Sequence, residues 1–410
     1  MRGRRHGDVM MAGSVVAGRM RARHADLRLY VQSRAHRGPD HASLMGRAES
    51  LPPNQGLLIA RMSKTTPGNF FEDFRLGQLI QHATPRTITA GDVALYTALY
   101  GPRFAVQSSD EFARAIGYPR APVDDLLVFH VVFGKTVPDV SLNAVANLGY
   151  AECRFLKPVY PGDTLSASSE VIGLKENSNR KTGIVYVRSR GRNQHRQDVL
   201  EYVRWVMVRK RDEAAPAAAE QVPQLSDAVE AATLGGACPI LNTAAYDYVL
   251  AGAPYRLHDY KPGERIDHID GMTVEEAEHQ LATRLYQNTA RVHFNLFSEA
   301  QGRFGKRLIY GGHAISLARA LSFNGLANAF QVAAINGGRH VAPLFAGATV
   351  FAWSQVLARA ELPGREDVGA LRLRTFATTD RPCADFPGPA GKDYDPAVIL
   401  DLDYWALVPR

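Results

Sequence analysis

Two adjacent glycines, Gly311 and Gly312, precede a long apolar segment and could stabilise a negative charge. If that segment is a buried helix, the glycines stand at its start. Unpaired backbone N–H groups and the positive end of the helix dipole favour a developing anion there. A tight turn is the alternative interpretation of the pair. A similar apolar segment earlier in the chain follows Asp124 and Asp125, which would repel an anion and are more simply explained as helix caps.

His293 lies upstream of the glycines, five residues after Asn288. An imidazole titrates near neutral pH, so it can remove a proton and deliver it in turn. An amide can hold a water molecule but cannot take up its proton. Near a site that stabilises an anion, this pair could add or remove water. The structural alternatives are a hydrogen-bonding histidine and an asparagine in a turn. His313 and His340 are expected to have packing roles.

These candidates belong to the second of two similar halves of the chain, related by a shift of about 185 residues. The run that begins at Arg154 and ends at Thr164 is matched by the run from Arg339 to Thr349. Ser169 and Val171 are likewise matched by Ser354 and Val356, and Leu99-Tyr100 by Leu285-Tyr286. We therefore expect the same fold twice.

Each half shows the same order of expected elements. A Thr-x-x-acid pattern at Thr89 and again at Thr273 predicts a capped helix that ends near the Leu-Tyr pair. Residues 126–137 and 314–326 have too few polar positions for a surface helix, so each should be a buried helix. Alternating, β-branched runs then predict long antiparallel strands. The expected strands are residues 164–174, 183–190, 200–210, 349–358, 371–379 and 398–407.

One long buried helix wrapped by an antiparallel sheet is the hot-dog fold, so the chain is expected to be an α+β protein with two hot-dog units in tandem. The Ala/Pro/Glu-rich stretch that starts at residue 213 suggests the linker. The expected organisation is an N-terminal hot-dog unit at 62–212, a linker at 213–240 and a C-terminal unit at 241–410. Residues 1–61 should form a disordered, Arg-rich extension. A transit peptide or translation from an upstream start codon could each explain it.

Composition and charge exclude several classes of protein. The formal net charge is +7, and the first 61 residues, with eleven Arg and four acids, account for all of it. The remainder is balanced and argues against nucleic-acid binding. Three widely spaced cysteines form neither a disulfide framework nor a zinc pattern, so we expect no metal site and a reducing cytoplasm. No apolar run of about 18 residues is present, so no membrane association is expected.

The chain resembles the MaoC-like dehydratases, the superfamily of (R)-specific enoyl-CoA hydratases, over about residues 69–410. The residues before each buried helix carry the resemblance. They are Leu99-Tyr-Gly-Pro102 followed by Gln107, and Leu285-Tyr-Gln-Asn288 followed by His293. The runs RFAVQSSDEFARAIGYPR, VFGKTVPDVSLNAVANLGYAECRFL and EVIGLKENSN are similar, more narrowly, to the mesaconyl-CoA hydratases, also called β-methylmalyl-CoA dehydratases.

The resemblance implies how the candidate residues would act. In the superfamily an Asp and a His five residues apart share the water that is added or removed. The first half has Pro102 and Gln107 at those positions, whereas the second half has Asn288 and keeps His293. It therefore implies one degenerate and one active half, with His293 as the acid/base residue, Asn288 holding water, and Gly311-Gly312 stabilising the thioester enolate. Because Asn cannot take a proton, a further acid remains unassigned, with Glu299 a weak candidate.

The implied reaction is the reversible dehydration of β-methylmalyl-CoA to mesaconyl-CoA by a hydro-lyase. Its substrate has a free carboxylate, for which Arg291 is the first candidate partner and Arg339 the second. A solvent-facing loop residue is an equal alternative for Arg291, and a buried ion pair that serves folding is the alternative for Arg339. Lys157, Arg180 and Lys181 are candidate contacts for the phosphates of coenzyme A. No separate cofactor and a homo-oligomeric assembly are expected. The alternatives are a hydratase for another enoyl-CoA, a hot-dog thioesterase, or a non-catalytic acyl-CoA binding module.

Overall fold

The computed structural model describes residues 64–216 and 219–410. The expected Arg-rich extension, residues 1–61, lies outside the described residues, as do two residues of the expected linker. All described residues belong to one unit, Ser63–Arg410.

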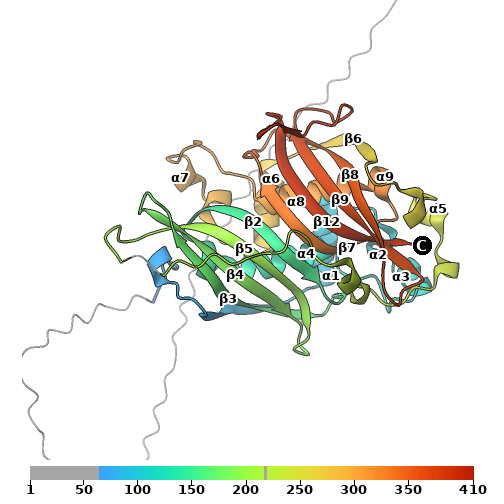
Figure 1. Ribbon diagram of the computed structural model, residues 1–410, viewed down its shortest axis with the longest axis horizontal. Helices are drawn as coiled ribbons and strands as arrows, with labels where there is room; N and C mark the ends of the chain where they lie inside the picture. Colours follow the sequence, from blue (N-terminus) through green and yellow to red (C-terminus); the bar gives the residue numbers. More distant parts are fainter. Residues whose placement is uncertain (1–63, 217–218) are drawn as a thin grey trace, which may run out of the picture. The chain divides into compact units, whose positions relative to one another are not determined.

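The described chain is built on an antiparallel sheet of ten strands (Figure 1). The strand order is β1-β3-β4-β5-β2-β7-β12-β9-β8-β6. The strands are β1 Leu79–Thr87, β2 Ala144–Phe155, β3 Thr164–Glu176, β4 Thr182–Arg192, β5 Asp198–Arg209, β6 Arg265–Thr273, β7 Gln331–His340, β8 Thr349–Glu361, β9 Val368–Thr379 and β12 Val398–Pro409. A separate hairpin pairs β10 Pro389–Ala390 with β11 Asp393–Tyr394.

The two halves meet where β2 pairs with β7. Read from either edge of the sheet, the five strands follow the same order, since β6-β8-β9-β12-β7 repeats β1-β3-β4-β5-β2. Cross-strand pairs agree as well, because Gly149 faces Trp205 on β5 in the first half and Ala334 faces Trp405 on β12 in the second. The repeat in the sequence is therefore a repeat in the fold.

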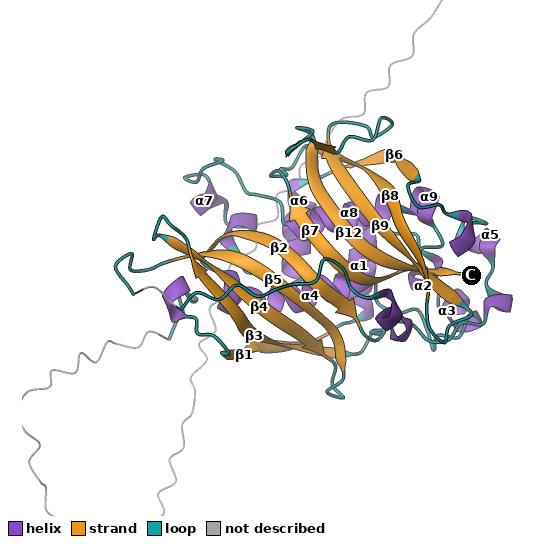
Figure 2. Ribbon diagram, viewed as in Figure 1, coloured by secondary structure: helices purple, strands orange, loops and turns teal. Residues whose placement is uncertain are grey.

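One face of the sheet is covered by helices, of which α4 and α8 are the buried ones (Figure 2). In α4 every residue from Leu126 to Thr136 is buried, and in α8 every residue from Gly312 to Leu321. The helices are α1 Ala90–Tyr100, α2 Ala105–Ser108, α3 Asp110–Ala115, α4 Asp125–Thr136, α5 Tyr248–Ala251, α6 Glu276–Leu285, α7 Leu296–Glu299, α8 Gly311–Leu321 and α9 Phe323–Leu326.

The six expected strands and the first buried helix are confirmed within a few residues. The second expected helix, residues 314–326, is divided, because Asn324 and Gly325 leave helical conformation and separate α8 from α9. The capping box at Thr89 is confirmed by reciprocal hydrogen bonds with Asp92. The one expected at Thr273 is wrong. That residue ends β6, and its hydroxyl lies 2.8 Å from the Thr349 hydroxyl.

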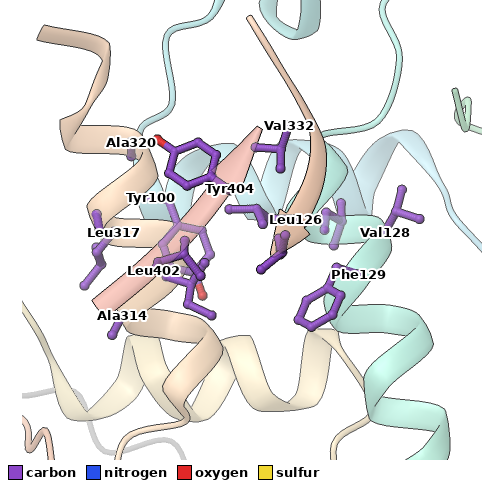
Figure 3. Close-up of a cluster of buried hydrophobic side chains, with 14 of the residues drawn as sticks. Tyr100, Leu126, Val128, Phe129, Ala314, Leu317, Ala320, Val332, Leu402 and Tyr404 are labelled. Atoms are coloured by element: carbon purple, nitrogen blue, oxygen red, sulfur yellow. The ribbon is translucent and has the colours of Figure 1, made fainter. Parts of the chain in front are cut away.

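A continuous apolar core joins the two halves between the helices and the sheet. Leu126 and Phe129 from α4 pack in this core with Leu317 from α8 and with Leu402 and Tyr404 from β12 (Figure 3). Aliphatic and aromatic side chains of this size each contribute about 1.5–3 kcal/mol when fully buried. Because the core spans both buried helices, the two halves stabilise each other.

The expected linker follows the face of the sheet opposite the buried helices (Figure 2). Gln221 forms a β-bridge with Leu174 of β3, and the N–H of Ser226 donates to Glu152 of β2. Farther on, Val229 is buried and accepts a hydrogen bond from the Trp405 indole of β12. The described part of this segment is thus a strap that crosses from the first half to the second.

These layers give an α+β fold of two hot-dog units that share one sheet. In the part of the chain that the structure describes, every helix is too short or too polar to cross a lipid bilayer.

Candidate active site

The first turn of α8 presents free backbone N–H groups. The residue before the helix is Tyr310, whose side chain makes no capping hydrogen bond, so the turn begins uncapped. By contrast, Asp124 caps α4 by accepting from the Leu126 N–H at 2.9 Å. The two buried helices therefore differ in charge preference at their N-termini. The start of α8 suits an anion, and the start of α4 already holds a carboxylate.

Close packing explains why glycine occupies the first two positions of α8. A side chain at Gly311 would collide with the ring of His340 on β7, and one at Gly312 with His130 and Tyr310. Gly311 and Gly312 are the first two residues of α8, so they begin the helix and do not form a separate tight turn. The His340 ring lies directly against the start of α8.

His293 is buried at the end of the 3₁₀ turn Arg291–His293. Its Nδ1–H donates to the Leu308 carbonyl at 2.9 Å, which leaves the lone pair on Nε2. Burial lowers the pKa of His293 to about 4, a shift that the Leu308 carbonyl opposes and that the nearby His279 and His340 rings increase. At neutral pH the ring is uncharged and able to accept a proton at Nε2. It packs edge-on against Tyr310, with 5.5 Å between ring centroids.

Asn288 is buried in the loop between α6 and this turn. Its side-chain oxygen accepts the Ala290 N–H at 3.0 Å, and its own N–H donates to the Thr283 carbonyl. This arrangement matches the turn role. The amide N–H₂ group is the part of the side chain that remains to orient water. The loop packs on the first half of the protein, because Gly134 of α4 lies against the backbone of Tyr286 and Asn288.

A buried network of hydroxyls and imidazoles runs between the halves. The Tyr286 hydroxyl donates to the Tyr100 hydroxyl at 2.7 Å, and the latter lies 2.8 Å from Nδ1 of His313. His130 Nε2 lies 3.0 Å from the Ser316 hydroxyl. Tyr100 and Tyr286 are a pair in the sequence repeat, so this network marks the approximate two-fold axis. His313 thus has the packing and hydrogen-bonding role expected from the sequence.

The first half has a different set of groups at the equivalent place. Gln107 donates to the Phe330 carbonyl at 2.9 Å, and a small cavity beside it is lined by Pro102 and Asp124. Burial raises the pKa of Asp124, an effect opposed by nearby Arg319. At the equivalent place the first half thus has an amide at Gln107 and an acid at the helix start, whereas the second half has His293 and two glycines.

The structure separates the two expected carboxylate partners from His293. Arg339 is exposed on β7, next to the inward-facing His340, so it points to the opposite face of the sheet. Its cross-strand neighbour there is Asp401, which pairs with Arg374. Arg291 shares the turn with His293 but is exposed, whereas His293 is buried. Two residues correspond to a rotation of about 240° in a 3₁₀ helix, so the solvent-facing alternative describes Arg291.

The three expected phosphate contacts are exposed cations at two distant places. Lys157 follows β2, whereas Arg180 and Lys181 form the turn between β3 and β4. The length of β3 separates the two places, roughly 40 Å at about 3.3 Å per residue. Lys181 lies 3.8 Å from Glu213. The structure therefore does not bring these cations together, and a phosphate role for each stays a prediction.

Comparison with known proteins places the chain in a family. A sequence model of the family described as mesaconyl-CoA hydratase matches residues 55–386. The chain belongs to the mesaconyl-CoA hydratase family. It is 65% identical over 350 residues to a β-methylmalyl-CoA dehydratase of Chloroflexus aurantiacus, covering 85% of this chain and 99% of that protein. It is 61% identical to a mesaconyl-CoA hydratase of Cereibacter sphaeroides, with 85% and 100% covered.

Solved structures agree with this family and with the fold. A crystal structure of a MaoC domain dehydratase from Chloroflexus aurantiacus is 64% identical, covers 85% of this chain and 99% of its own, and superposes with a TM-score of 0.83. A double hot-dog protein from Mycobacterium tuberculosis is 24% identical, with 84% and 99% covered and a TM-score of 0.63. The second likeness concerns the fold alone.

Sequence reasoning gave no part in the site to three residues that lie near His293 or the start of α8 in this member of the mesaconyl-CoA hydratase family. Tyr310 precedes Gly311, and His340 lies against it, while Tyr150 of β2 places its hydroxyl 3.3 Å from His340 Nε2. His340 ends β7, a strand that was not expected because its Asn-Gly-Gly sequence lacks alternation. Tyr150 comes from the other half, so no local pattern could have linked it to His293.

Proposed function

We propose that the protein catalyses the reversible dehydration of β-methylmalyl-CoA to mesaconyl-CoA, as a hydro-lyase. The observation that carries this proposal is identity of 65% and 61%, over nearly their whole lengths, to proteins with these two activities. The site geometry supports it, because a neutral, buried imidazole and the uncapped start of a buried helix lie on either side of Tyr310. Coenzyme A enters with the substrate, and the proposed chemistry needs no other cofactor.

In the dehydration direction, Nε2 of His293 removes the proton from the carbon next to the thioester. The electron pair of that C–H bond moves toward the thioester oxygen and forms an enolate. The N–H groups of Gly311 and Gly312 then stabilise the oxygen, because the helix dipole and two aligned donors act in a site with little water. Removing one such donor from an enzyme typically costs about 10²–10³-fold in kcat.

The hydroxyl group leaves in the second step. The enolate electrons form the double bond, the C–O bond breaks, and the proton held by His293 passes to the departing oxygen as water. One imidazole therefore serves as base and then as acid, which removes the need for the missing Asp. The Asn288 N–H₂ group orients the leaving oxygen, and the low pKa of His293 makes its protonated form a strong proton donor.

The test follows the ultraviolet absorbance of the enoyl thioester with purified protein and mesaconyl-CoA, and identifies the product by mass spectrometry. We expect a loss of absorbance with formation of β-methylmalyl-CoA. Release of a free thiol would indicate a thioesterase instead. Tight binding with no reaction of any enoyl-CoA in a small panel would indicate a binding module.

We also propose a cytoplasmic, homo-oligomeric enzyme. The three cysteines are buried and unpaired, which suits a reducing compartment. Light scattering of the purified protein tests the oligomer directly, and a monomer would refute it.

A further inference from the structure

Arg204 of β5 is completely buried and has no acidic partner. Its guanidinium donates to the hydroxyls of Thr136, at 2.7 Å, and Ser141, at 3.2 Å, and lies over the Phe133 ring at 4.2 Å from the centroid. Within residues 64–216 and 219–410, no carboxylate lies within ion-pair distance of it. A buried cation without a counter-charge costs several kcal/mol, so its retention calls for an explanation.

The other buried arginines of the described chain are compensated. Arg365 pairs with Asp367 at 2.7 Å. Arg319 of α8 lies close enough to Asp124 and Asp125 to affect the pKa of both. Arg204, in contrast, is surrounded by the phenols of Tyr150, Tyr202 and Tyr310. Unlike lysine, an arginine does not escape this cost by losing its proton.

Polar atoms without partners gather beside Arg204. Its own Nε, the Tyr202 hydroxyl, and both polar atoms of the Asn147 side chain are buried and lack a hydrogen bond in the structure. Tyr202 and Arg204 are two residues apart on β5 and share its inner face. Asn147 of β2 stands opposite Val206, the next residue on that face. Unsatisfied buried donors are rare, and several in one place indicate a missing ligand.

Two series of contacts connect this group to the start of α8. On one side, the Phe133 ring under Arg204 lies 5.7 Å from Tyr310, which packs on His293. On the other, Tyr150 faces Arg204 across β2 and β5, and its hydroxyl reaches His340 beside Gly311. The cation is therefore connected to the start of α8 through Phe133 and Tyr310 on one side and through Tyr150 and His340 on the other.

The second half has no such group at the equivalent place. Tyr404 of β12 faces Ile335 as Arg204 of β5 faces Tyr150, so Tyr404 occupies the equivalent position and Leu402 that of Tyr202. An arginine is thus not a requirement of this position in the fold. Its presence is specific to the first half, whose Tyr150 contacts His340 beside Gly311.

We propose that Arg204, Tyr202 and Asn147 form a subsite for the free carboxylate of the substrate. This inference rests on the proposed function, because mesaconyl-CoA carries that carboxylate on the carbon that takes up water. Donors from a guanidinium, a phenol and an amide suit a carboxylate, and the ligand supplies the charge that Arg204 lacks. Arg204 takes the role that the sequence assigned to Arg291.

The experiment compares hydration of mesaconyl-CoA with that of crotonyl-CoA, which has a methyl group in place of the carboxylate and a hydrogen in place of the methyl group next to the thioester. For Arg204→Met we expect kcat/KM for mesaconyl-CoA to fall at least 30-fold, while that for crotonyl-CoA changes less than 3-fold. Arg204→Lys should keep part of the selectivity, because a point charge lacks the planar fork. Tyr202→Phe removes one donor without changing the packing and should raise KM for mesaconyl-CoA alone.

Arg319→Met is the matched control, since Arg319 is also buried over a phenylalanine ring, that of Phe104. Its substrate ratio should equal that of the wild type. Equal losses on both substrates in Arg204→Met, with unchanged selectivity in Tyr202→Phe, would overturn the subsite. If Arg204→Met does not fold, the ratio of kcat/KM for mesaconyl-CoA to that for crotonyl-CoA in Tyr202→Phe and Arg204→Lys tests the subsite by itself. A wild-type protein that does not hydrate mesaconyl-CoA would instead refute the proposed function.

Discussion

Acidification from pH 7 to pH 5 should destabilise this protein strongly, because five histidines have a strongly lowered pKa in the folded state. Burial is the largest cause of each shift, and it lowers the pKa to about 3 for His130 and His313 and to about 4 for His268, His293 and His340. In the unfolded chain each would titrate near 6.5. Between these values the unfolded chain binds more protons than the folded one, so stability is complete above pH 6.5 and is lost as the pH falls toward 4.

The size of the effect follows from linkage. Each ring loses about 2 kcal/mol between pH 7 and pH 5, and five independent rings would lose about 9 kcal/mol. Asp124 and Asp125 act in the opposite direction, since burial raises the pKa of each and they gain protons in the folded state. Even if each Asp took up a full proton on folding over this pH range, the free energy of unfolding would still fall by about 4 kcal/mol. For a chain of this length that lowers the melting temperature by about 5 °C or more.

The assay is thermal unfolding by circular dichroism at half-unit steps from pH 7.5 to 5, at constant ionic strength. Gln at position 268 can still donate to Asn324 and accept from Ser354. His268→Gln should therefore reduce the pH dependence of the unfolding free energy by the equivalent of about one proton. His195→Gln is the control, because His195 is exposed and should leave the slope unchanged. A melting temperature that does not change over this range would show that the fold does not hold these rings neutral, and would refute the neutral state of His293 as well.

Substitutions at three positions, His293, Asn288 and Gly311, test the proposed catalytic groups. His293→Gln should lower kcat for mesaconyl-CoA hydration by roughly 10²–10⁴-fold without changing the melting temperature. Gln107→Ala should lower kcat far less. Equal losses of kcat in the two variants would mean that the active and degenerate halves are assigned wrongly. Asn288→Ala should slow the reaction and Asn288→Asp, which still accepts the Ala290 N–H, should retain it; full activity of Asn288→Ala would limit this residue to the turn. Gly311→Ala should cost about 1–3 kcal/mol through collision with His340 and should slow turnover, and combining it with His340→Ala should restore stability, as measured by denaturant unfolding. If the double variant is no more stable than Gly311→Ala alone, close packing does not explain the glycine.

The sequence predicts the architecture well because the repeat constrains it twice. The long strands have β-branched residues at alternate positions, and α4 has almost no polar face, so their periodicity is unambiguous. Periodicity failed for β2 and β7, where glycines and polar residues interrupt the pattern at the junction of the halves. It failed also at the end of α8, although the Asn324-Gly325 pair is itself a turn signal.

The grouping of the candidate residues was predictable only where they are close in the chain. His293, Asn288 and the two glycines lie within 25 residues, and the structure gathers them around Tyr310 or on the same loop. Arg204, Tyr202 and Asn147 are brought together by the pairing of β5 with β2, and this group was not predicted from the sequence. One signal was nevertheless present in the sequence. Arg204 alternates with Tyr202 and Val206 along β5, so its side chain is on the buried face of the strand. A charged residue on such a face needs a ligand or a partner.

Because β2 and β7 belong to one chain, the two halves of the enzyme need not have identical sequences. In a dimer of identical subunits every substitution appears in both copies. An acid that caps the buried helix of one subunit would then also repel an anion at the start of that helix in the other. Here Asp124 and Gly311 coexist, and the sheet of one half can carry Arg204 while the other carries Tyr404. The covalent tether also makes pairing of the halves intramolecular, so dilution should not separate the imidazole from the cation. We therefore expect a single catalytic centre in each polypeptide, and titration with a tight-binding substrate analogue should saturate at one equivalent per chain.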